Sequence, residues 1–448
     1  QGDIMNIAVD VDNGKCWFGI NGTWNGSGDP AAGTNATFTN ANITSCIASA
    51  RPRSSTVVWN FGQDSSFAGN KTAQGNQDDN DKGDFYYAPP TGFLALCTAN
   101  LPDPSIALPG ENFNTVLWDG DGTSPRSISG VGFSPDLVWG KARDDTWGHK
   151  WQDVVRGSEN TIWSNNTNAE DDYYIWGYLS AFDSDGFTIT AGASGSQGWN
   201  DSTDTFVAWN WKAGTAFDPA TAGTVVTGSG SANATAGFSI IKYTGTTSNV
   251  TVGHGLSAAP ELVIIKGLDS TLNWFVNDPT ATPFTKYLKL DANSSSGSSS
   301  TMYQDTAPNA SVVTLGTSGL VNAAEDFIMY CFHSVEGYSK VGSWVATGSD
   351  PGPFFYCGFK PAFVMVKNVS RTNSNWWIMD NKRSTYNMDA KVLFPNTNAA
   401  EASGRSECDF LSNGIKFRGV VNPESNYSTD TYLTYAVAES PFKTSNAR

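Results

Sequence analysis

The chain has 448 residues, a length that allows roughly three or four domains of about 100–150 residues each. Only 16% of its residues are charged, 45 are glycine and 12% are aromatic, which favours many short strands joined by turns over long amphipathic helices. The formal net charge of −16 argues against nucleic acid and against an anionic membrane surface as partners. No apolar run approaches the ~20 residues that a membrane-spanning helix needs, so we expect no membrane insertion.

The first hundred residues carry strand and turn signals in close succession. Two alternating runs, 7–12 and 15–20, flank the pair Asn13-Gly14, and an Asn-Gly pair between such runs strongly predicts a hairpin. Residues 55–62 are predicted to form the next strand. Residues 78–81 are predicted to form an acidic loop in solvent.

Two segments between the predicted folded regions differ from them in composition. Residues 99–112 are rich in proline, which predicts a stiff extended linker. Residues 215–237 are rich in Gly, Ala, Thr and Ser, which predicts a flexible joint or a loop along the surface. The remaining chain divides into three β repeats, 113–214, 238–338 and 339–448, and the last two follow each other with almost no gap.

One strand recurs almost unchanged in the three repeats. Pro135–Lys141, Pro260–Lys266 and Pro361–Lys367 each begin with a proline, continue with apolar residues and end with a lysine. A proline at the first residue of a strand loses no hydrogen bond of the sheet, and the apolar run suits a strand that is buried on both faces. We expect each lysine to leave the core and point into water at the edge.

Other landmarks follow this strand at similar offsets. A tryptophan and then an aspartate come after the lysine, and an alternating aromatic strand closes each repeat. The landmark residues are Trp151 and Asp153, Trp274 and Asp278, Trp376 and Asp380, with Trp209, Tyr330 and Tyr435 in the closing strands. These shared offsets predict one ancestral β fold in triplicate, and hence an all-β chain of tandem antiparallel β-sandwich domains.

Residues 1–98 resemble a known family. The orders Ile-Ala-Val-Asp-Val-Asp-Asn-Gly-Lys-Cys-Trp-Phe-Gly-Ile at 7–20, Val-Val-Trp-Asn-Phe-Gly-Gln at 57–63 and Pro-Pro-Thr-Gly-Phe at 89–93 are similar to the C-terminal half of a SPRY domain. The resemblance implies a concanavalin-like, jelly-roll type sandwich that binds partners through its loops and has in general no catalytic machinery. Because the N-terminal strands of that family are missing and the chain starts at Gln1, we expect further residues upstream, or a sheet completed by another segment or chain.

Three further motifs resemble structural proteins of tailed bacteriophages. They are Leu-Cys-Thr-Ala-Asn-Leu-Pro-Asp-Pro at 96–104, Gly-Phe-Ser-Pro-Asp-Leu-Val-Trp at 132–139 and Glu-Ser-Pro-Phe-Lys-Thr-Ser-Asn-Ala-Arg at 439–448. The resemblance implies a fibre-like virion protein and offers no active site to transfer.

No catalytic residue set stands out in the sequence. The three histidines, His149, His254 and His333, lie far apart in the sequence and in different contexts, and no nucleophile elbow, zinc-protease or phosphate-loop motif is present. The aspartate that recurs once in each repeat is best explained as a structural, hydrogen-bonded residue, with ligand contact or catalysis as alternatives. Two carboxylates that are distant in sequence and cleave a polysaccharide together also stay open as an alternative.

Aspartate pairs and cysteines leave two smaller questions open. The pairs Asp10/Asp12, Asp119/Asp121 and Asp183/Asp185 offer the hard oxygen ligands that calcium prefers, although such residues are also the usual chemistry of turns. We predict no other metal or cofactor. The six cysteines have no metal-binding or disulfide-scaffold spacing, so we expect free thiols, with a Cys331–Cys357 disulfide as the alternative.

The 16 tryptophans are the most informative feature for function. Five of them lie in polar loops: Trp24, Trp147, Trp163, Trp176 and Trp199. An exposed indole flanked by amides and carboxylates suits carbohydrate binding, because the apolar face of a sugar stacks on the ring while its hydroxyls meet the polar groups. The alternative is that these rings pack between loops or between protomers.

The sequence therefore predicts a non-enzymatic surface protein of a bacteriophage virion, a tail fibre or appendage that attaches to a host-surface glycan or receptor. We expect it to contact other virion proteins and to form a homotrimer, because neighbouring protomers would cover exposed edge strands. The alternatives are a capsid decoration or head-fibre protein without a receptor, and a polysaccharide depolymerase.

Overall fold

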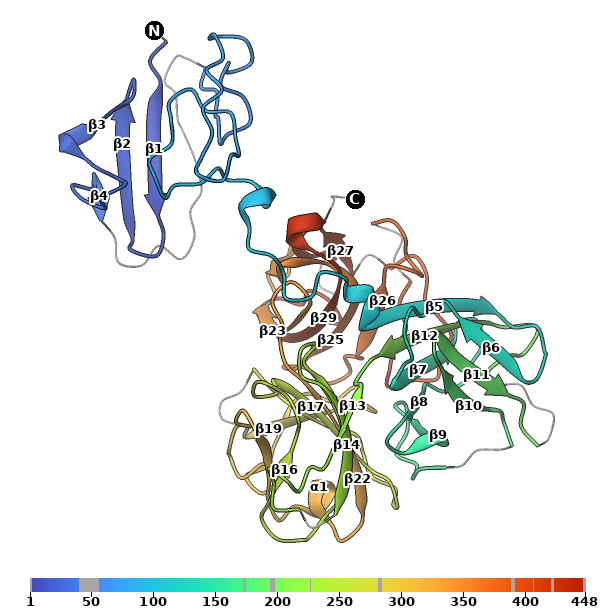
Figure 1. Ribbon diagram of the computed structural model, residues 1–448. Coiled ribbons are helices and arrows are strands. Elements are labelled where there is room, and N and C mark those ends of the chain that lie inside the picture. Colours follow the sequence, from blue (N-terminus) through green and yellow to red (C-terminus); the bar gives the residue numbers. More distant parts are fainter. Residues whose placement is uncertain are drawn as a thin grey trace. The chain divides into compact units, whose positions relative to one another are not determined.

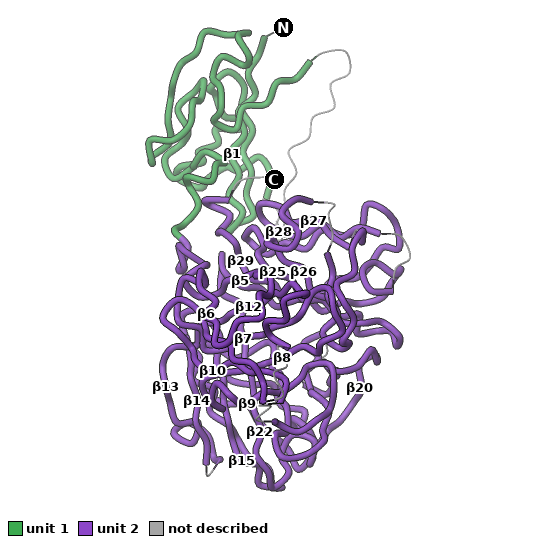
Figure 2. The backbone as a smooth tube through the Cα atoms, turned by 90° about the vertical axis from the view of Figure 1, so that its right-hand side faces the viewer, with its two compact units in different colours: residues 1–103 green, residues 104–448 purple. Residues whose placement is uncertain are grey.

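The computed structural model describes residues 2–39, 56–171, 175–193, 198–225, 227–280, 284–387, 391–405, 407–419 and 423–445. These residues confirm the all-β fold class, since every strand pairing between them is antiparallel and the α-helix α1 (Gly319–Asn322) has four residues (Figure 1). In this part of the chain no helix is long and apolar enough to cross a membrane. The chain forms two compact units, unit 1 (1–103) and unit 2 (104–448) (Figure 2).

Unit 1 is built on the predicted hairpin. Strand β1 (Met5–Asp10) pairs with β2 (Lys15–Ile20), and Gly14 takes a positive φ of 62° in the turn between them. The short strands β3 (Thr23–Trp24) and β4 (Phe38–Thr39) complete the sheet. Inside it, the buried ring of Trp17 meets Phe93 edge to face at 5.9 Å.

The predicted strand at 55–62 is absent. Ser55 lies outside the described residues, and 56–62 form no strand. The side chain of Asn60 accepts hydrogen bonds from the backbone N–H groups of Gly62, Gln63 and Asp64, which bends the chain into a turn. An asparagine that binds the backbone just ahead of it competes in this way with pairing in a sheet.

The predicted solvent loop at 78–81 is also wrong for its first residue. Asp78 is buried, and its carboxylate accepts hydrogen bonds from the N–H groups of Ala95 and Lys82 and from the amide of Asn100. Burial alone would raise the pKa of Asp78, but these hydrogen bonds outweigh it and lower the pKa to about 2. Asp78 therefore fixes the C-terminal part of unit 1 as an ionised structural group.

Unit 2 contains three modules whose main sheets share one strand order. In each sheet a first strand pairs with the closing aromatic strand, this pairs with the recurring central strand, and the central strand pairs with a fourth. Module 1 has β5 (Phe113–Asp119), β12 (Thr205–Trp211), β7 (Leu137–Ala142) and β8 (Lys150–Asp153), extended by β9 (Gly157–Trp163). Module 2 has β15 (Phe238–Thr244), β22 (Asp326–Phe332), β17 (Leu262–Gly267) and β18 (Phe275–Asn277), extended by β19 (Lys286–Lys289) and β20 (Gly297–Ser298). Module 3 has β23 (Ser339–Val345), β29 (Thr431–Pro441), β25 (Phe359–Asn368) and β26 (Trp377–Asp380).

A second, smaller sheet packs on each main sheet and makes each module a sandwich. Module 1 has β6 (Arg126–Ser129), β10 (Tyr178–Asp183) and β11 (Gly186–Thr190); module 2 has β16 (Val250–Gly253) and β21 (Val312–Leu315); module 3 has β24 (Phe354–Tyr356), β27 (Cys408–Leu411) and β28 (Gly414–Phe417). The 3-10 turns are η1 (Asn25–Ser27), η2 (Thr98–Asn100), η3 (Pro109–Glu111) and η4 (Phe442–Thr444).

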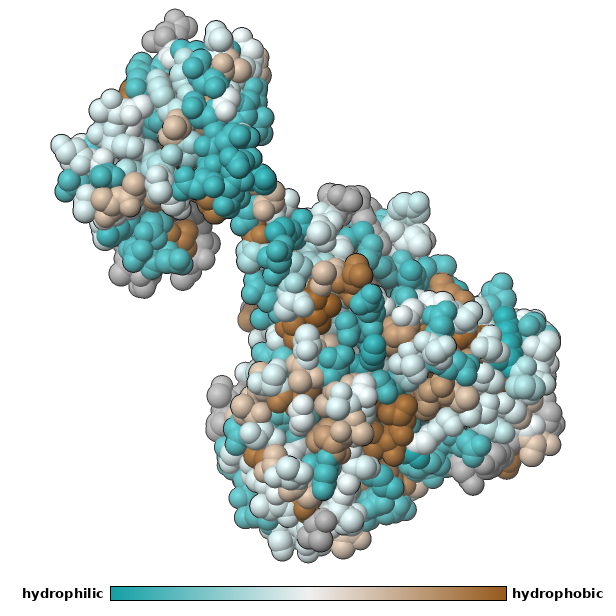
Figure 3. Space-filling view, in the orientation of Figure 1, coloured by the Kyte–Doolittle hydropathy of each residue, from teal (hydrophilic) through white to brown (hydrophobic). Residues whose placement is uncertain are grey.

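Each main sheet is buried on both faces because the modules share a core. Along the central strands, Val138, Val263 and Val364 face the private core of their own sandwich. The next residues, Trp139, Ile264 and Met365, face one common core to which all three modules contribute. The alternation of a strand thus places one row of side chains in each core, which accounts for the continuous apolar runs in the sequence. On the face shown in Figure 3, hydrophobic patches of unit 2 are small and lie among hydrophilic residues.

Hydrogen bonds from aromatic side chains join the modules in the shared core. Module 2 donates to module 1, module 3 to module 2, and module 1 to module 3. The pairs are Trp274 Nε1 to Trp163 O (2.8 Å), Tyr330 OH to Asp153 Oδ2 (2.8 Å), Trp376 Nε1 to Lys289 O (2.8 Å) and Trp209 Nε1 to Asp380 Oδ2 (3.0 Å). The contacts therefore run in one direction around a closed ring of modules.

The three lysines that end the central strands are buried, which corrects the prediction that they point into water. The Nζ atoms donate to backbone carbonyls: Lys141 to Asp145 O (2.8 Å), Lys266 to Gly267 O (2.7 Å) and Lys367 to Ser374 O (2.6 Å). Burial lowers their pKa values to about 8, 8 and 7. Loop carbonyls satisfy these amines in place of water.

Both predicted connectors contain packed structure. In the linker 99–112, Ile106 is buried in the shared core. In the predicted joint 215–237, β13 (Thr215–Phe217) and β14 (Gly228–Asn233) add to the sheet of module 2. The glycines there serve close packing, because a Cβ at Gly230 would lie 2.4 Å from the ring of Phe217.

Candidate functional site

The aspartates that recur in each module are structural. In module 1 Asp153 forms a fully buried ion pair with Arg156 (2.6 Å), and in module 3 Asp380 forms the same pair with Arg383 (2.6 Å). Asp278 of module 2 instead accepts hydrogen bonds from Thr280 (2.6 Å) and Ser296 (2.6 Å). The carboxylates are thus engaged in contacts within the protein. They form part of what we call the frame, the residues that hold the three modules together around the shared core.

The register of the strands corrects one equivalence made from the sequence. In module 1, Trp151 lies opposite Trp139 of the central strand. The equivalent pairs are Val276 opposite Ile264 in module 2 and Ile378 opposite Met365 in module 3. The residue of module 1 that corresponds to Trp274 and Trp376 is therefore His149, two positions earlier. Its backbone N–H is bound by Asn165, as that of Trp274 is bound by Asp291 and that of Trp376 by Asn396.

With this register, Lys150 occupies a core position. Its counterparts are Phe275, buried in the private core of module 2, and Trp377, buried in that of module 3. Lys150 is itself 2% exposed. Module 1 therefore has an amine where the other two modules have an aromatic ring.

Three of the five predicted tryptophans surround this amine, and a fourth, Trp176, packs against one of the three. Lys150 Nζ lies 4.9 Å from the ring centroid of Trp199, 5.5 Å from that of Trp163 and 5.9 Å from that of Trp147, distances at which a cation is attracted by the ring. The ring of Trp176 lies 6.0 Å from that of Trp147 at an angle of 54°. The sequence prediction thus found one cluster, although it did not find the lysine at its centre.

Backbone contacts connect the amine to Trp176. Lys150 Nζ donates to the carbonyl of Gly198 (3.0 Å), and the N–H of Gly198 donates to the carbonyl of Trp176 (2.9 Å). Burial lowers the pKa of Lys150 well below 10.5, and the like charge of Lys141 lowers it further. Among the ion pairs of the described residues none involves Lys150.

The outer rim of the cluster is formed by Trp147 and Trp176. Trp176 is 38% exposed and Trp147 is partly buried. The carboxylate of Asp204 lies close to Trp147, and burial, together with the charges of Asp145, Asp201 and Asp144, raises the pKa of Asp204. The rim therefore combines one exposed and one partly buried indole with negative charge.

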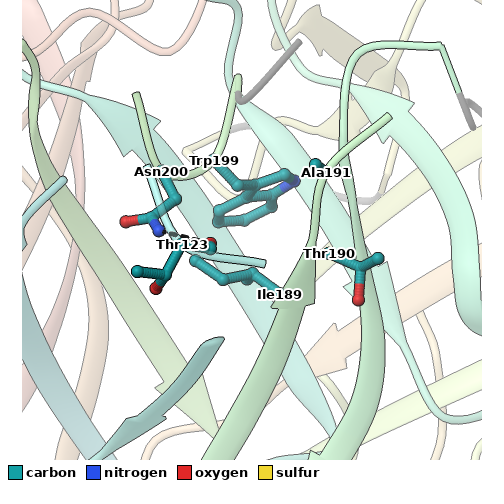
Figure 4. A pocket seen from close by; sticks show the side chains of 6 residues that line it. All are labelled: Thr123, Ile189, Thr190, Ala191, Trp199 and Asn200. Carbon is teal, nitrogen blue, oxygen red and sulfur yellow. Dashed lines mark hydrogen bonds between the residues drawn. The ribbon is translucent and has the colours of Figure 1, made fainter. Parts of the chain in front are cut away.

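Trp199 packs in the private core of module 1 and is 2% exposed, so it offers no ring face to solvent. Its ring lies on Gly140 of β7, where a Cβ would be 2.0 Å from the ring. It also borders a pocket lined by Thr123, Ile189, Thr190, Ala191, Trp199 and Asn200 (Figure 4). Asn200 closes one side of that pocket by donating to the carbonyl of Thr123 (2.9 Å).

The fifth predicted tryptophan, Trp24, belongs to unit 1. It is half-buried on β3, where it pairs with Gly19. Trp24 is therefore treated as a separate candidate.

Four of the six predicted calcium ligands accept hydrogen bonds within the protein. Asp10 accepts from Asn13, Asp121 from Thr123 and Asn200, Asp183 from Thr188, and Asp185 from the N–H groups of Gly130 and Gly132. In the described parts of the chain, no three His, Cys, Asp or Glu side chains form a group that could hold a metal ion.

Cys97, Cys331, Cys357 and Cys408 are free thiols, and Cys46 lies outside the described residues. The expected free state is therefore confirmed for these four. The alternative disulfide is wrong, because Cys331 lies in the private core of module 2 and Cys357 in that of module 3.

Sequence reasoning missed Lys150 and Gly140 as partners of the tryptophans. A signal was available, since alignment of the repeats on their central strands places Gly140 against Ile265 and Val366. The same register places Lys150 against two aromatic residues. Positions where one copy departs from the other two mark where module 1 has changed.

The fold and these contacts define an all-β scaffold of three similar sandwiches closed around a common aromatic core. The chain belongs to the family described as a domain of unknown function (DUF7483), whose sequence model matches residues 108–441. No curated protein and no solved structure matches the chain.

Proposed function

We propose that this chain is a non-enzymatic surface protein of a tailed-bacteriophage virion, a fibre or appendage that attaches to a glycan on the host cell. The observation that carries the proposal is the rim formed by the exposed indole of Trp176 and the partly buried indole of Trp147, which lie 6.0 Å apart. Rings at this spacing can stack on the apolar face of a sugar. The resemblance of three sequence motifs to phage structural proteins supports the virion location, and we propose other virion proteins and a homotrimer as its assembly context.

The charge around the rim favours one class of glycan. Asp204 lies against Trp147, and Asp144, Asp145 and Asp201 add negative charge close by. Like charges across an interface disfavour a partner. The proposed ligand is therefore a neutral or amine-bearing saccharide rather than an acidic one.

A glycan array tests this proposal with the full chain. We expect binding to neutral or amino sugars that falls about 5- to 150-fold in Trp147→Ala and in Trp176→Ala, because the comparable stacking of a base on one aromatic ring is worth ~1–3 kcal/mol. Tyr386→Ala is the matched control, since Tyr386 is 77% exposed in module 3. Binding that survives both tryptophan substitutions would disprove the assignment of the rim.

Two further measurements separate the alternatives. Release of oligosaccharides from host polysaccharide by the purified chain would identify a depolymerase. Imaging of labelled chains on the particle distinguishes an appendage that contacts the host from a capsid decoration.

A further inference from the structure

Lys150 stands at a position where the fold prefers an aromatic residue. Phe275 and Trp377 fill the equivalent places and pack into the private cores of their modules. An amine at such a place lacks their apolar contacts and must leave water, which lowers stability. A residue that lowers the stability of the fold at its position is a candidate for a role in function.

The contacts of Lys150 lead from the interior to both rings of the rim. Its Nζ faces the ring of Trp147 at 5.9 Å and donates to Gly198 O at 3.0 Å. Gly198 in turn holds the backbone of Trp176 through its N–H group at 2.9 Å. A Cβ at Gly198 would lie 3.2 Å from Lys150 Nζ and 2.7 Å from Trp176 O, so these groups meet in one place.

Other polar atoms in the same core are also left without partners. Trp199 Nε1 and Gln152 Oε1 are buried and find no hydrogen-bond partner among the described residues. Gln152 follows Lys150 on β8 by two residues, so both side chains enter the private core. The private core of module 1 therefore contains unsatisfied polar atoms beside the residues that support the rim.

We propose that Lys150 is a positioning residue, which holds Trp147 by a cation–π contact and Trp176 through Gly198 at the spacing that a sugar ring requires. The inference rests on the proposed function of the rim. Lys150 does not touch the ligand, and it acts by fixing the rings before the ligand arrives, which lowers the entropic cost of binding.

The test compares affinity and stability in the same variants of the full chain. Lys150→Met keeps an unbranched side chain of similar length without the charge, and Lys150→Phe installs the residue of module 2. We expect either variant to bind the best glycan from the array about tenfold more weakly, while its urea midpoint is unchanged or higher. The matched control is Lys286→Met, because Lys286 is exposed in module 2.

The pH profile of the unmodified chain provides an independent readout. The cation–π contact needs the protonated amine, and burial and Lys141 favour the neutral one. Glycan affinity is therefore expected to fall as pH rises through the titration of the Lys150 amine. The profile should become flat in Lys150→Met.

The outcomes distinguish the two proposals. If Trp147→Ala abolishes binding but Lys150→Met and its pH profile match the unmodified chain, the positioning role is wrong and the rim remains. If affinity and the urea midpoint fall together in both Lys150 variants, Lys150 is only structural and the inference is overturned. If Trp147→Ala binds normally, the proposed function fails first.

Discussion

Module 1 and its two sister modules share a frame but differ in their private cores. The position of Gly140 holds Ile265 in module 2 and Val366 in module 3, both fully buried. The position of Lys150 holds Phe275 in module 2 and Trp377 in module 3. Modules 2 and 3 thus use these places for packing, whereas module 1 uses them to seat Trp199 and a ring of indoles around an amine.

The face toward the shared core keeps two features in all three modules. Each module presents an aspartate there, and each closing strand presents an aromatic residue: Trp209, Tyr330 or Tyr435. These aspartates and aromatic residues therefore belong to the frame that the modules have in common. Substitutions at equivalent positions can measure the difference directly.

The largest expected effect comes from the frame. Asp380→Ala removes the buried partner of Arg383 and the acceptor of Trp209 Nε1, and breaking a buried ion pair in this way costs about 3–5 kcal/mol. Asp278→Ala, at the equivalent place, leaves only hydroxyl and N–H donors without an acceptor, at a cost of about 1–3 kcal/mol. Urea unfolding followed by tryptophan fluorescence measures both.

Glu336→Ala serves as the control for these two variants, because Glu336 is exposed. Equal losses for Asp380→Ala and Asp278→Ala would contradict the view that the arginine makes the frame of module 3 more sensitive than that of module 2. If neither variant loses free energy of unfolding, the aspartates do not stabilise the frame.

The second effect concerns the seat of Trp199. Gly140→Ala places a methyl group 2.0 Å from that ring, and overpacking of this kind costs about 2–3 kcal/mol. Gly110→Ala is the matched control, because a Cβ there meets nothing within 4 Å. If Gly140→Ala unfolds at the same urea concentration as the control, the ring of Trp199 can move aside. That result would contradict the view that module 1 needs a glycine at this position to seat Trp199.

The sequence predicted the strands better than it predicted their surroundings. Proline-led apolar runs, the Asn13-Gly14 turn and the alternating aromatic strands are local signals, and the structure contains strands at each. What covers a strand is not local: the second face of β7, β17 and β25 is covered by other modules. For the same reason the tryptophans of the candidate site were found individually, while the amine that they surround was not.

The predictions for the joint 215–237 and for the terminal lysines were wrong for a related reason. Lysine usually ends in water, yet Lys266 has the carbonyl of Thr167 within 3.4 Å, 99 residues earlier in the chain. Glycine-rich sequence usually indicates flexibility, yet Gly230 lies under the ring of Phe217. Both depend on contacts that only the folded chain creates.

The smallest expected effect is on the pH dependence of stability, and it distinguishes the lysines that end the central strands from Lys150. Lys141, Lys266 and Lys367 have pKa values of about 8, 8 and 7 in the folded chain, and lysine titrates near 10.5 when unfolded. Between pH 7 and 9 the unfolded chain therefore binds more protons than the folded one, so the free energy of unfolding rises with pH. Lys367→Met should reduce this rise by about 1–2 kcal/mol without changing glycan affinity, whereas Lys150→Met should change affinity. Thermal unfolding at pH 7, 8 and 9 tests the predicted effect of Lys367→Met on stability. A slope that Lys367→Met leaves intact would mean that the carbonyls around this amine hold it protonated, and that the three modules end their central strands on buried cations.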